Sequence, residues 1–339
     1  MEDTNFTVVK YDFHNEDHLN DYHKLFNLLL TELERPIVTI DQLRQNQMNQ
    51  SPDSRVIIYM AYSKHELVGR LSIQIPLKDN THRLVFYIFF KKVFYRKEYI
   101  KAFFPSLVQT AKEYNRQILV TDSYLPDLIT IYKEYGATLA LAERSRRLDI
   151  SSSNVELIQK ELVNKLEKLK DYSFVFYKDA FPRDDIQGVC DMMTLVNRLT
   201  PIGEMDFEEP ERTPEMLLEA EKNDRARGIT TIWLYAKEKR SNKYIGYTGM
   251  AWNKKSPHFV NQLMTGVVKE HQGKGIAVIL KYDLFLRLLK ENSQALTIET
   301  TNAKINEAMI HINEKLGFKL YREYILCQFS LLKLKSLLF

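Results

Sequence analysis

The stretch Gly266–Leu289, GVVKEHQGKGIAVILKYDLFLRLL, decides the fold. An apolar run stops at a short charged loop with two glycines, and an amphipathic helical pattern follows. Its apolar face is formed by Ile276, Ile279, Leu280, Leu284 and Leu288. A second apolar run, ALTIETT, comes next and is typical of a strand. The order strand, loop, helix, strand predicts an α/β unit with the loop at a helix N-terminus.

The loop itself predicts binding of an anion. Gln272, Gly273, Lys274 and Gly275 lie where the strand gives way to the helix. The first N–H groups of a helix have no intrahelical partner, and the helix dipole favours negative charge there. Glycine also lets the main chain approach a ligand closely. The loop is not of the GxxxxGK[ST] type, because Val268 stands at its first glycine position. A purely structural turn is the alternative.

The chain contains two copies of one order of elements. Residues 55–75 and 230–252 both read as two strands joined by a turn, with Gly69 and Gly246 in matching places. Further on, Gly136 and Gly317 each end a helical pattern and precede a strand-like run. Both glycine pairs are separated by nearly the same length of chain. We therefore predict an α/β fold built from two tandem copies of one unit.

A serine-rich joint separates the copies. The segment DISSSNVELIQKELVNKLEKL predicts a linker helix, and Ser153 with Glu156 matches the pattern of a capping box. One face of this helix carries Val155, Ile158, Leu162, Leu166 and Leu169. The predicted organisation is a first domain at 1–150, a linker helix at 151–172 and a second domain at 173–339.

Composition favours a globular protein of a reducing compartment. A length of 339 residues leaves room for two domains. Cys190 and Cys327 are too few for a disulfide framework and match no zinc spacing, so we expect no metal. The N-terminal stretch lacks the pattern of a secretory leader, and no segment has the length of a membrane span. We expect a soluble, cytoplasmic protein. The net charge of +4 does not predict a nucleic-acid partner, and the oligomeric state is left open.

Two motifs resemble one known family. The loop reads Gln272-x-x-Gly275-x-Ala277 and resembles the [RQ]-x-x-G-x-[GA] motif of the GCN5-related N-acetyltransferases, abbreviated GNAT. The stretch TTNAKINEAMIHINEKLGF at 300–318 is similar to that family's later asparagine-bearing strand end, helix and Leu-Gly-Phe turn. The resemblance covers about residues 173 to 331 by motif and the first 150 residues by architecture. It implies a tandem acetyltransferase fold.

The resemblance implies acetyl-CoA as cosubstrate. Main-chain amides would hold the diphosphate, from Gln272, Gly273, Lys274, Gly275, Ile276 and Ala277. The strand backbone at Val267 and Val268 would pair with the pantetheine amides, as an open strand edge can. Asn302 and Asn306 are the matching cofactor contacts of the family. Turn formation and helix capping are equally good interpretations of these two asparagines.

The reaction implied is acetyl transfer to a primary amine of a small molecule by direct attack in a ternary complex. A backbone N–H near Val267 or Val268 is placed to polarise the thioester carbonyl. Many family members carry a tyrosine, as acid for the thiolate, four residues before the helix-ending glycine. Asn313 stands there in this sequence, so Tyr321, Tyr324 or water are the candidates. Tyr132 fills the equivalent position of the first copy, where packing is the expected role.

Carboxylates are the candidate bases. Glu204 and Asp206, with Glu208 and Glu209 beside them, lie in an acidic segment that borders the acceptor site in this fold. Glu299 on the strand ALTIETT is the second candidate. A solvated acidic loop is the alternative for the first group. Cys327 on a late strand is expected to be a buried structural cysteine, not an acyl-enzyme nucleophile.

The first copy departs from the motif. Its loop, KKVFYRKEYI at 91–100, has no glycine, so we predict that this domain does not bind acetyl-CoA. Four basic residues there are expected to be solvated: Lys91, Lys92, Arg96 and Lys97. Two other function classes stay open. The missing tyrosine favours a non-catalytic acyl-CoA binder or sensor, whereas the intact QGKGIA segment argues against a tRNA-dependent aminoacyl transferase.

Overall fold

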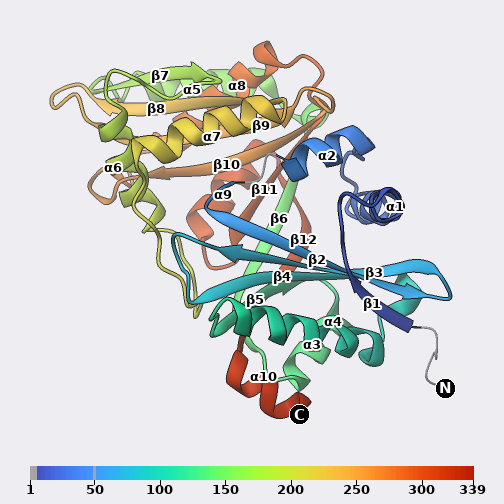
Figure 1. Cartoon of the computed structure of the whole chain (residues 1–339). Coiled ribbons are helices and arrows are strands. Elements are labelled where there is room, and N and C mark those ends of the chain that lie inside the picture. The colour runs from blue at the N-terminus through green and yellow to red at the C-terminus, as the bar shows by residue number, and fades with distance from the viewer. Residues whose placement is uncertain (1–5, 49–50) are drawn as a thin grey trace. The chain divides into compact units, whose positions relative to one another are not determined.

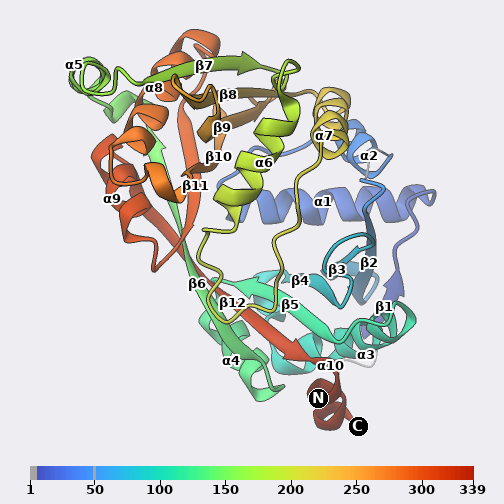
Figure 2. The ribbon, with the colours of Figure 1, turned by 90° about the vertical axis from the view of Figure 1, so that its left-hand side faces the viewer.

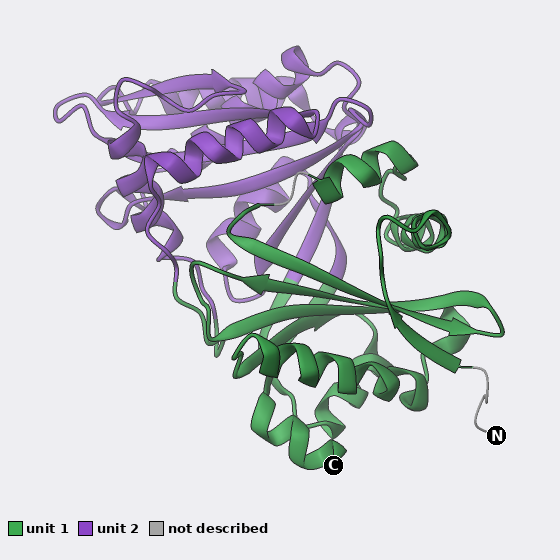
Figure 3. Cartoon of the chain, in the orientation of Figure 1, with its two compact units in different colours: residues 1–143, 203–208, 323–339 green, residues 144–202, 209–322 purple. Residues whose placement is uncertain are grey.

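The computed structural model describes residues 6–48 and 51–339, and it divides the chain into two compact units (Figure 1, Figure 3). Unit 1 comprises Met1–Glu143, Gly203–Glu208 and Glu323–Phe339, and unit 2 comprises Arg144–Ile202 and Glu209–Arg322. The first five residues of the N-terminal stretch, where we expect no leader, lie outside the described residues. Each unit is a sheet with helices on both faces, which confirms the predicted α/β class.

Unit 1 is a mixed sheet in the order β1-β2-β3-β4-β5-β12. Its strands are β1 (Phe6–Lys10), β2 (Ser54–Ser63), β3 (Glu66–Pro76), β4 (Arg83–Phe90), β5 (Ile118–Ser123) and the end of β12 (Lys319–Ser330). The single parallel pair is β4 with β5, within the residues described. Two helices lie on one face, α1 (Glu16–Glu32) and α2 (Ile40–Met48), and on the other face lie α3 (Lys97–Glu113), α4 (Pro126–Glu134) and α10 (Leu331–Leu338) (Figure 1).

Unit 2 repeats this plan in the order β7-β8-β9-β10-β11, with β6 beside β11. Its strands are β7 (Tyr172–Lys178), β8 (Ile229–Glu238), β9 (Tyr244–Asn253), β10 (Phe259–Val267), β11 (Thr297–Ala303) and the end of β6 (Thr138–Asp149). Figure 2 shows α6 (Ile186–Asn197) and α7 (Pro214–Ala226) on one face of this sheet. The other face carries α5 (Val155–Leu166) and α8 (Ile276–Glu291), while α9 (Glu307–Leu316) follows β11.

The predicted repeat is confirmed element by element. Each copy runs strand, two helices, three strands, helix, strand, helix, strand. Gly136 and Gly317 both end a helix in the left-handed region, with φ of 87° and 101°, where a residue with a Cβ is strained. In the sheets, Gly69 pairs with Phe90 and Gly246 with Val267 at equivalent registers. The glycine pairs therefore mark equivalent points of the two copies.

The compact units do not follow the boundary suggested by the sequence near residue 150. The last strand of the second copy, β12, ends in unit 1, where residues 325–330 pair antiparallel with β5. The last residues of the first copy's strand, β6, belong to unit 2. A strand pattern in the sequence predicts that a strand forms. It does not predict the partner strand, because pairing depends on residues far apart in the chain.

The linker helix is present, but its predicted cap is wrong. Helix α5 begins at Val155, and the side chain of Asn154 accepts a hydrogen bond from the N–H of Leu157 at 3.0 Å. The hydroxyl of Ser153 is buried and has no hydrogen-bond partner among the described residues. Asparagine is as good an N-cap as serine, so the helix begins one residue later than the capping-box pattern indicates.

Candidate functional site

A gap opens in unit 2 between β10 and β11. These parallel strands pair only from Phe259 to Asn261 on β10, opposite Thr297 to Glu299 on β11. Directly afterwards β10 has a bulge, because its pairing with β9 shifts register between Gln262 and Thr265. The Gln262 amide donates to the carbonyl of Gly249 at 2.7 Å and so holds the bulge. A bulge bends its strand, and the rest of β10 is thereby freed from β11.

The backbone of Val267 faces this gap. The N–H of Val268 donates to the carbonyl of Ile245 on β9 at 2.9 Å. Successive residues of a strand point their N–H and C=O groups to opposite sides, so Val267 turns away from β9. The Gln272 side chain confirms this direction, since its amide donates to the carbonyl of Val267 at 3.0 Å. Of the two valines named from the sequence, Val267 offers its N–H to a ligand, whereas that of Val268 is already used.

The loop after β10 has the form of an anion cradle. Gly273 and Gly275 have φ of 76° and 87°, in the left-handed region that favours glycine. A Cβ built on either one meets no atom within 4 Å, so the space over both is open. Gly275 is the N-cap of α8 and carries no capping side chain, so the first amides of the helix, at Ile276 and Ala277, have no intrahelical acceptor. These features are those of an anion-binding helix N-terminus.

Two basic side chains of this loop contact β7. The Lys274 ammonium donates to the hydroxyl of Tyr172 at 3.2 Å. Nδ1 of His271 lies 3.0 Å from the same hydroxyl, and the two rings meet edge to face. Tyr172 thus positions both residues beside the glycines. The charge of Lys274 adds to the positive end of the helix dipole at this point.

Asn302 and Asn306, the asparagines named from the sequence, lie at the end of β11 and at the N-cap of α9. Asn302, at the end of β11, accepts a hydrogen bond through Oδ1 from the amide of Asn313 at 2.7 Å. Asn313 is fully buried, and its own Oδ1 has no partner among the residues described. Asn306 is the N-cap of α9, because its side chain accepts from the N–H of Met309 at 3.2 Å. Helix capping, one of the two interpretations of Asn306, is therefore observed.

Most candidate acids and bases lie outside the unit that holds the loop. Glu204, Asp206 and Tyr324 belong to unit 1. Glu204 and Asp206 are exposed, and Asp206 Oδ1 lies 3.1 Å from Nε2 of His82. Tyr324 packs edge to face on Tyr124, with ring centroids 5.6 Å apart. Nothing in these contacts assigns the three side chains a chemical role.

Glu299 and Tyr321 are both tied to one arginine of unit 2. The guanidinium of Arg147 donates from Nε to Glu299 Oε2 at 2.8 Å, and the Glu299 side chain is 5% exposed. The same guanidinium lies over the ring of Tyr321, 3.5 Å from its centroid. A carboxylate held in a buried ion pair is poorly suited to act as a mobile base. This arrangement is suited to holding β6, β11 and β12 together.

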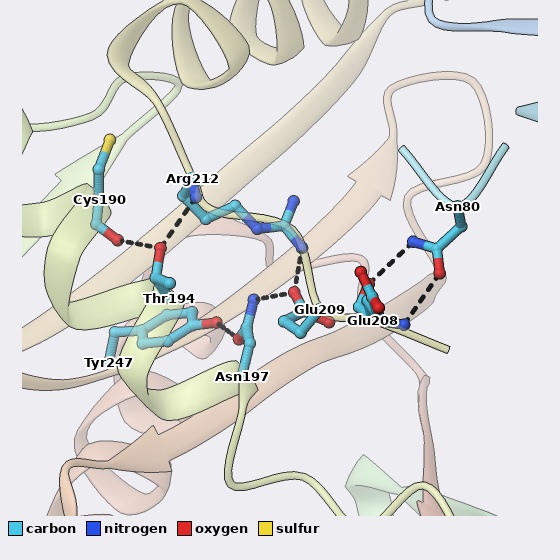
Figure 4. Close-up of polar contacts among 8 residues, drawn as sticks. All are labelled: Asn80, Cys190, Thr194, Asn197, Glu208, Glu209, Arg212 and Tyr247. Carbon is cyan, nitrogen blue, oxygen red and sulfur yellow. Dashed lines mark hydrogen bonds and ion pairs between the residues drawn. The ribbon is translucent and has the colours of Figure 1, made fainter. Parts of the chain in front are cut away.

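A partly buried polar network in unit 2 includes Glu209, which is named above only beside Glu204 and Asp206 (Figure 4). Glu209 Oε1 accepts from the amide of Asn197 at 3.0 Å and from the guanidinium of Arg212 at 2.9 Å. Asn197 in turn accepts from the hydroxyl of Tyr247 at 2.7 Å. Oε2 of Glu209 makes no hydrogen bond with the described part of the chain. The acidic segment predicts a carboxylate, but residue spacing in the sequence does not show which of its four carboxylates is held by this network.

The network lies on the α6 face, beside the end of the gap. Tyr247 on β9 is the cross-strand partner of Gly266, so their side-chain positions share a face of the sheet. A Cβ on Gly266 would lie 2.2 Å from Cγ1 of Val196, which shows how closely the end of α6 approaches β10. Gly266 adjoins Val267, whose backbone faces the gap. The Glu209 carboxylate is therefore on the sheet face opposite α8.

The equivalent strands of unit 1, β4 and β5, also pair over three residues, Arg83–Val85 with Ile118–Val120, but β4 lacks the bulge of β10. Strands β3 and β4 pair without a register shift from Gly69 to Gln74. Phe90 is the counterpart of Val267, and its ring packs edge to face on Tyr95, with ring centroids 6.1 Å apart. Burial raises the pKa of this tyrosine. Lys91 and Lys97 are paired with carboxylates, Lys97 with Glu134 at 2.7 Å. The loop after β4 contains no glycine, and that unit 1 does not bind acetyl-CoA stays a prediction.

Both cysteines are buried free thiols. Cys327 on β12 is fully buried, and burial raises its pKa to about 11. A thiol with a raised pKa is a poor nucleophile, which argues against acyl-enzyme chemistry. No helix within residues 6–48 and 51–339 is both long and apolar enough to cross a membrane.

The duplicated α/β unit matches the tandem GNAT fold of solved structures. A tandem GNAT protein from the clavulanic acid biosynthesis pathway, solved without AcCoA, matches with a TM-score of 0.74 and 17% identity over 96% of this chain and 98% of its own. A GCN5-related N-acetyltransferase from Sphaerobacter thermophilus matches with a TM-score of 0.66 and 11% identity, covering 97% and 96%.

Saccharomyces cerevisiae N-myristoyltransferase, solved with bound myristoyl-CoA, matches with a TM-score of 0.53 and 12% identity, covering 96% of this chain and 79% of its own. No protein-family profile and no curated protein sequence matches the chain. At these identities the likeness establishes the fold, and the predicted tandem GNAT architecture is confirmed.

Proposed function

We propose that the protein transfers an acetyl group from acetyl-CoA to a primary amine of a small molecule. The observation that carries this proposal is the cradle of Gly273 and Gly275 at the start of α8, next to the gap that Val267 faces. Left-handed glycines with open space above them, free helix amides and basic side chains together suit a diphosphate. The solved structures of the same fold include proteins described as N-acetyltransferases.

The cosubstrate would be held by main-chain groups of unit 2. The amides of Gln272 to Ala277 would bind the diphosphate, and the N–H of Val267 would pair with the pantetheine arm or polarise the thioester carbonyl. Such donors are fixed by the fold before the reaction begins. The acceptor amine must be neutral when it attacks the carbonyl carbon, so its proton has to leave first.

Glu209 is the carboxylate best placed to bind the acceptor amine and to accept its proton. Its side chain is 17% exposed, and Oε1 is fixed by Asn197 and Arg212 while Oε2 stays available. It lies on the α6 face, opposite the helix that begins at the cradle, so an amine could approach it without crossing the cosubstrate. A carboxylate there would attract a cationic amine and accept its proton directly or through water.

The proposal is tested by binding and by turnover. We expect calorimetric titration of acetyl-CoA into the wild-type chain to give one site per chain, and a panel of small amines to include at least one that releases free coenzyme A. Failure of a well-folded chain to bind acetyl-CoA would contradict the proposal. Binding without turnover of any amine would favour the second candidate, an acyl-CoA sensor, for which the absence of a tyrosine at Asn313 is the supporting observation.

We expect Glu209→Gln to raise the KM for a cationic amine by about 10- to 100-fold, because a hydrogen bond to a charged group contributes about 1.5–3 kcal/mol. The affinity for acetyl-CoA should not change. Steady-state kinetics with the amine found in the panel would measure both effects. Glu208→Gln is the matched control, since Glu208 is exposed and, among the residues described, its bonds to Asn80 are made by its main chain alone. Equal effects of the two substitutions would remove Glu209 from the acceptor site.

A further inference from the structure

A lysine is buried on the sheet side of α8. Lys281 is 1% exposed and lies among the apolar residues of that helix, such as Leu280 and Leu284. Its Nζ lies 5.7 Å from the centroid of the Phe318 ring. Burial lowers the pKa of Lys281 to about 7, and no carboxylate or other charged side chain among the described residues contributes to this shift.

Such a lysine destabilises the fold. Transfer of an ammonium group out of water is unfavourable unless a counter-charge is present, and here burial acts alone. A leucine or methionine would suit the position better as far as packing is concerned. Unpaired buried ionisable groups with strongly shifted pKa values gather at functional sites, so Lys281 calls for a chemical role.

The surroundings of Lys281 connect it to the gap. The N–H of Phe318, whose ring faces the ammonium, donates to the carbonyl of Asn313 at 3.0 Å. The Asn313 side chain donates to Asn302 at the end of β11. These contacts run from α8, which follows β10, to α9, which follows β11. These contacts therefore join α8 and α9, the helices that follow the two splayed strands. A side chain on a helix also points toward the N-terminus of its helix, which for Lys281 is the direction of the cradle.

We propose that Lys281 donates the proton that the thiolate of coenzyme A takes up as it departs. This inference rests on the proposed function, and it identifies the acid that the sequence leaves unassigned, because Asn313 has no labile proton to give. As the amine nitrogen forms its bond to the carbonyl carbon, the C–S bond breaks and the sulfur takes a proton from the Lys281 ammonium. Lys281 becomes neutral and is protonated again by the proton that the acceptor amine released.

The proton affinities suit this transfer. An alkyl thiol such as that of cysteine has a pKa of about 8.5, so a proton passes favourably from an ammonium whose pKa is about 7. A donor with that pKa is also partly protonated at neutral pH, which general acid catalysis requires. A solvated lysine would hold its proton too tightly to release it in this way. Burial without a counter-charge is thus what makes Lys281 a usable acid.

The test uses hydroxylamine as acceptor, a small amine that is already neutral at neutral pH. Single-turnover rates of acetyl transfer are measured with enzyme in excess over acetyl-CoA, so that product release does not hide the chemical step. In the wild type we expect the rate to fall as pH rises through about 7, because the ammonium form of Lys281 is lost. In Lys281→Met we expect a rate at least about 100-fold lower, with that descending limb absent.

Two controls separate a chemical role from a structural one. Leu284→Met changes the same buried helix face without removing a proton donor, and its rate should match that of the wild type. Lys281→Met should keep the wild-type affinity for acetyl-CoA and should melt at a higher temperature at neutral pH. The folded-state pKa is lowered, so the destabilisation by the ammonium is complete below pH 7 and disappears as pH rises toward the unfolded-state pKa. The gain in melting temperature should shrink over that range.

An unchanged pH profile in a cooperatively melting Lys281→Met would overturn the proposal. If that variant does not fold, a wild-type rate that stays flat above neutral pH overturns it equally. Restoration of the rate by Asn313→Tyr in the Lys281→Met background would support it further, because a phenol would then stand at the usual acid position. A wild type that binds no acetyl-CoA or transfers no acetyl group refutes the proposed function instead, so the two failures are distinguishable.

Discussion

Gly275→Glu should abolish acetyl-CoA binding while leaving the chain folded. Gly275 has φ of 87°, and a Cβ there meets only open space, so the new side chain would enter the volume that we assign to the diphosphate. It also places a negative charge beside the phosphates and at the positive end of α8. We expect the Kd to rise by more than about 100-fold, which is roughly 2.7 kcal/mol, and calorimetric titration would measure it.

Gly228→Glu is the matched control for this change. Gly228 also has a left-handed φ, of 68°, and a Cβ there also meets no atom within 4 Å, but it lies between α7 and β8 and not in the loop. Both variants carry the same strain, of about 1–2 kcal/mol for a non-glycine residue in that region. Their melting temperatures should fall together, while only the loop variant loses acetyl-CoA. Equal binding by both variants would show that the cradle does not hold the cosubstrate.

Arg147→Ala should destabilise unit 2 by about 3–5 kcal/mol, because it removes the guanidinium that pairs with the buried Glu299 carboxylate. The two side chains are 15% and 5% exposed and lie 2.8 Å apart, so water cannot replace the arginine readily. Stacking on Tyr321 is lost as well. Chemical unfolding monitored by tryptophan fluorescence would report the change, since both tryptophans of the chain, Trp233 and Trp252, lie in unit 2.

The double variant Arg147→Met with Glu299→Leu should recover most of that stability, because apolar side chains that replace a buried ion pair often stabilise the fold as much as the pair does. Arg198→Ala provides a control within the same unit. Arg198 pairs with Glu211 at 3.2 Å, but the two side chains are 48% and 78% exposed, and such a pair contributes about 0–1 kcal/mol. A cost for Arg147→Ala no larger than that of Arg198→Ala would mean that the buried pair is not structural.

The glycine loop before α8 was predictable from sequence because its properties are local. Left-handed φ at Gly273 and Gly275, free amides at a helix start and the strand before it all depend on a few consecutive residues. The catalytic candidates were not predictable in this way. Glu204 and Asp206 stand only a few residues before Glu209 and have the same chemistry, but only Glu209 lies in the unit of the loop and is fixed by Asn197 and Arg212.

Lys281 illustrates the same limit. Helical periodicity predicts the apolar face of α8 correctly, with Ile276, Ile279, Leu280, Leu284 and Leu288 all buried. A lysine beside this face reads as a solvated residue, because lysine is seldom buried. Only the packing of α8 against the sheet and against Phe318 shows that Lys281 is inside.

The amino-acid sequence by itself determined the duplicated α/β plan, the helix-ending glycines and the position of the cradle, since periodicity, capping and turn conformation are set by neighbouring residues. Only the tertiary structure decided that β12 pairs with β5, that β10 parts from β11 at a bulge, and which charged groups are buried. Strand partners and burial depend on residues far apart in the chain, and a pKa follows burial. The candidate chemistry therefore emerges only when the chain has folded.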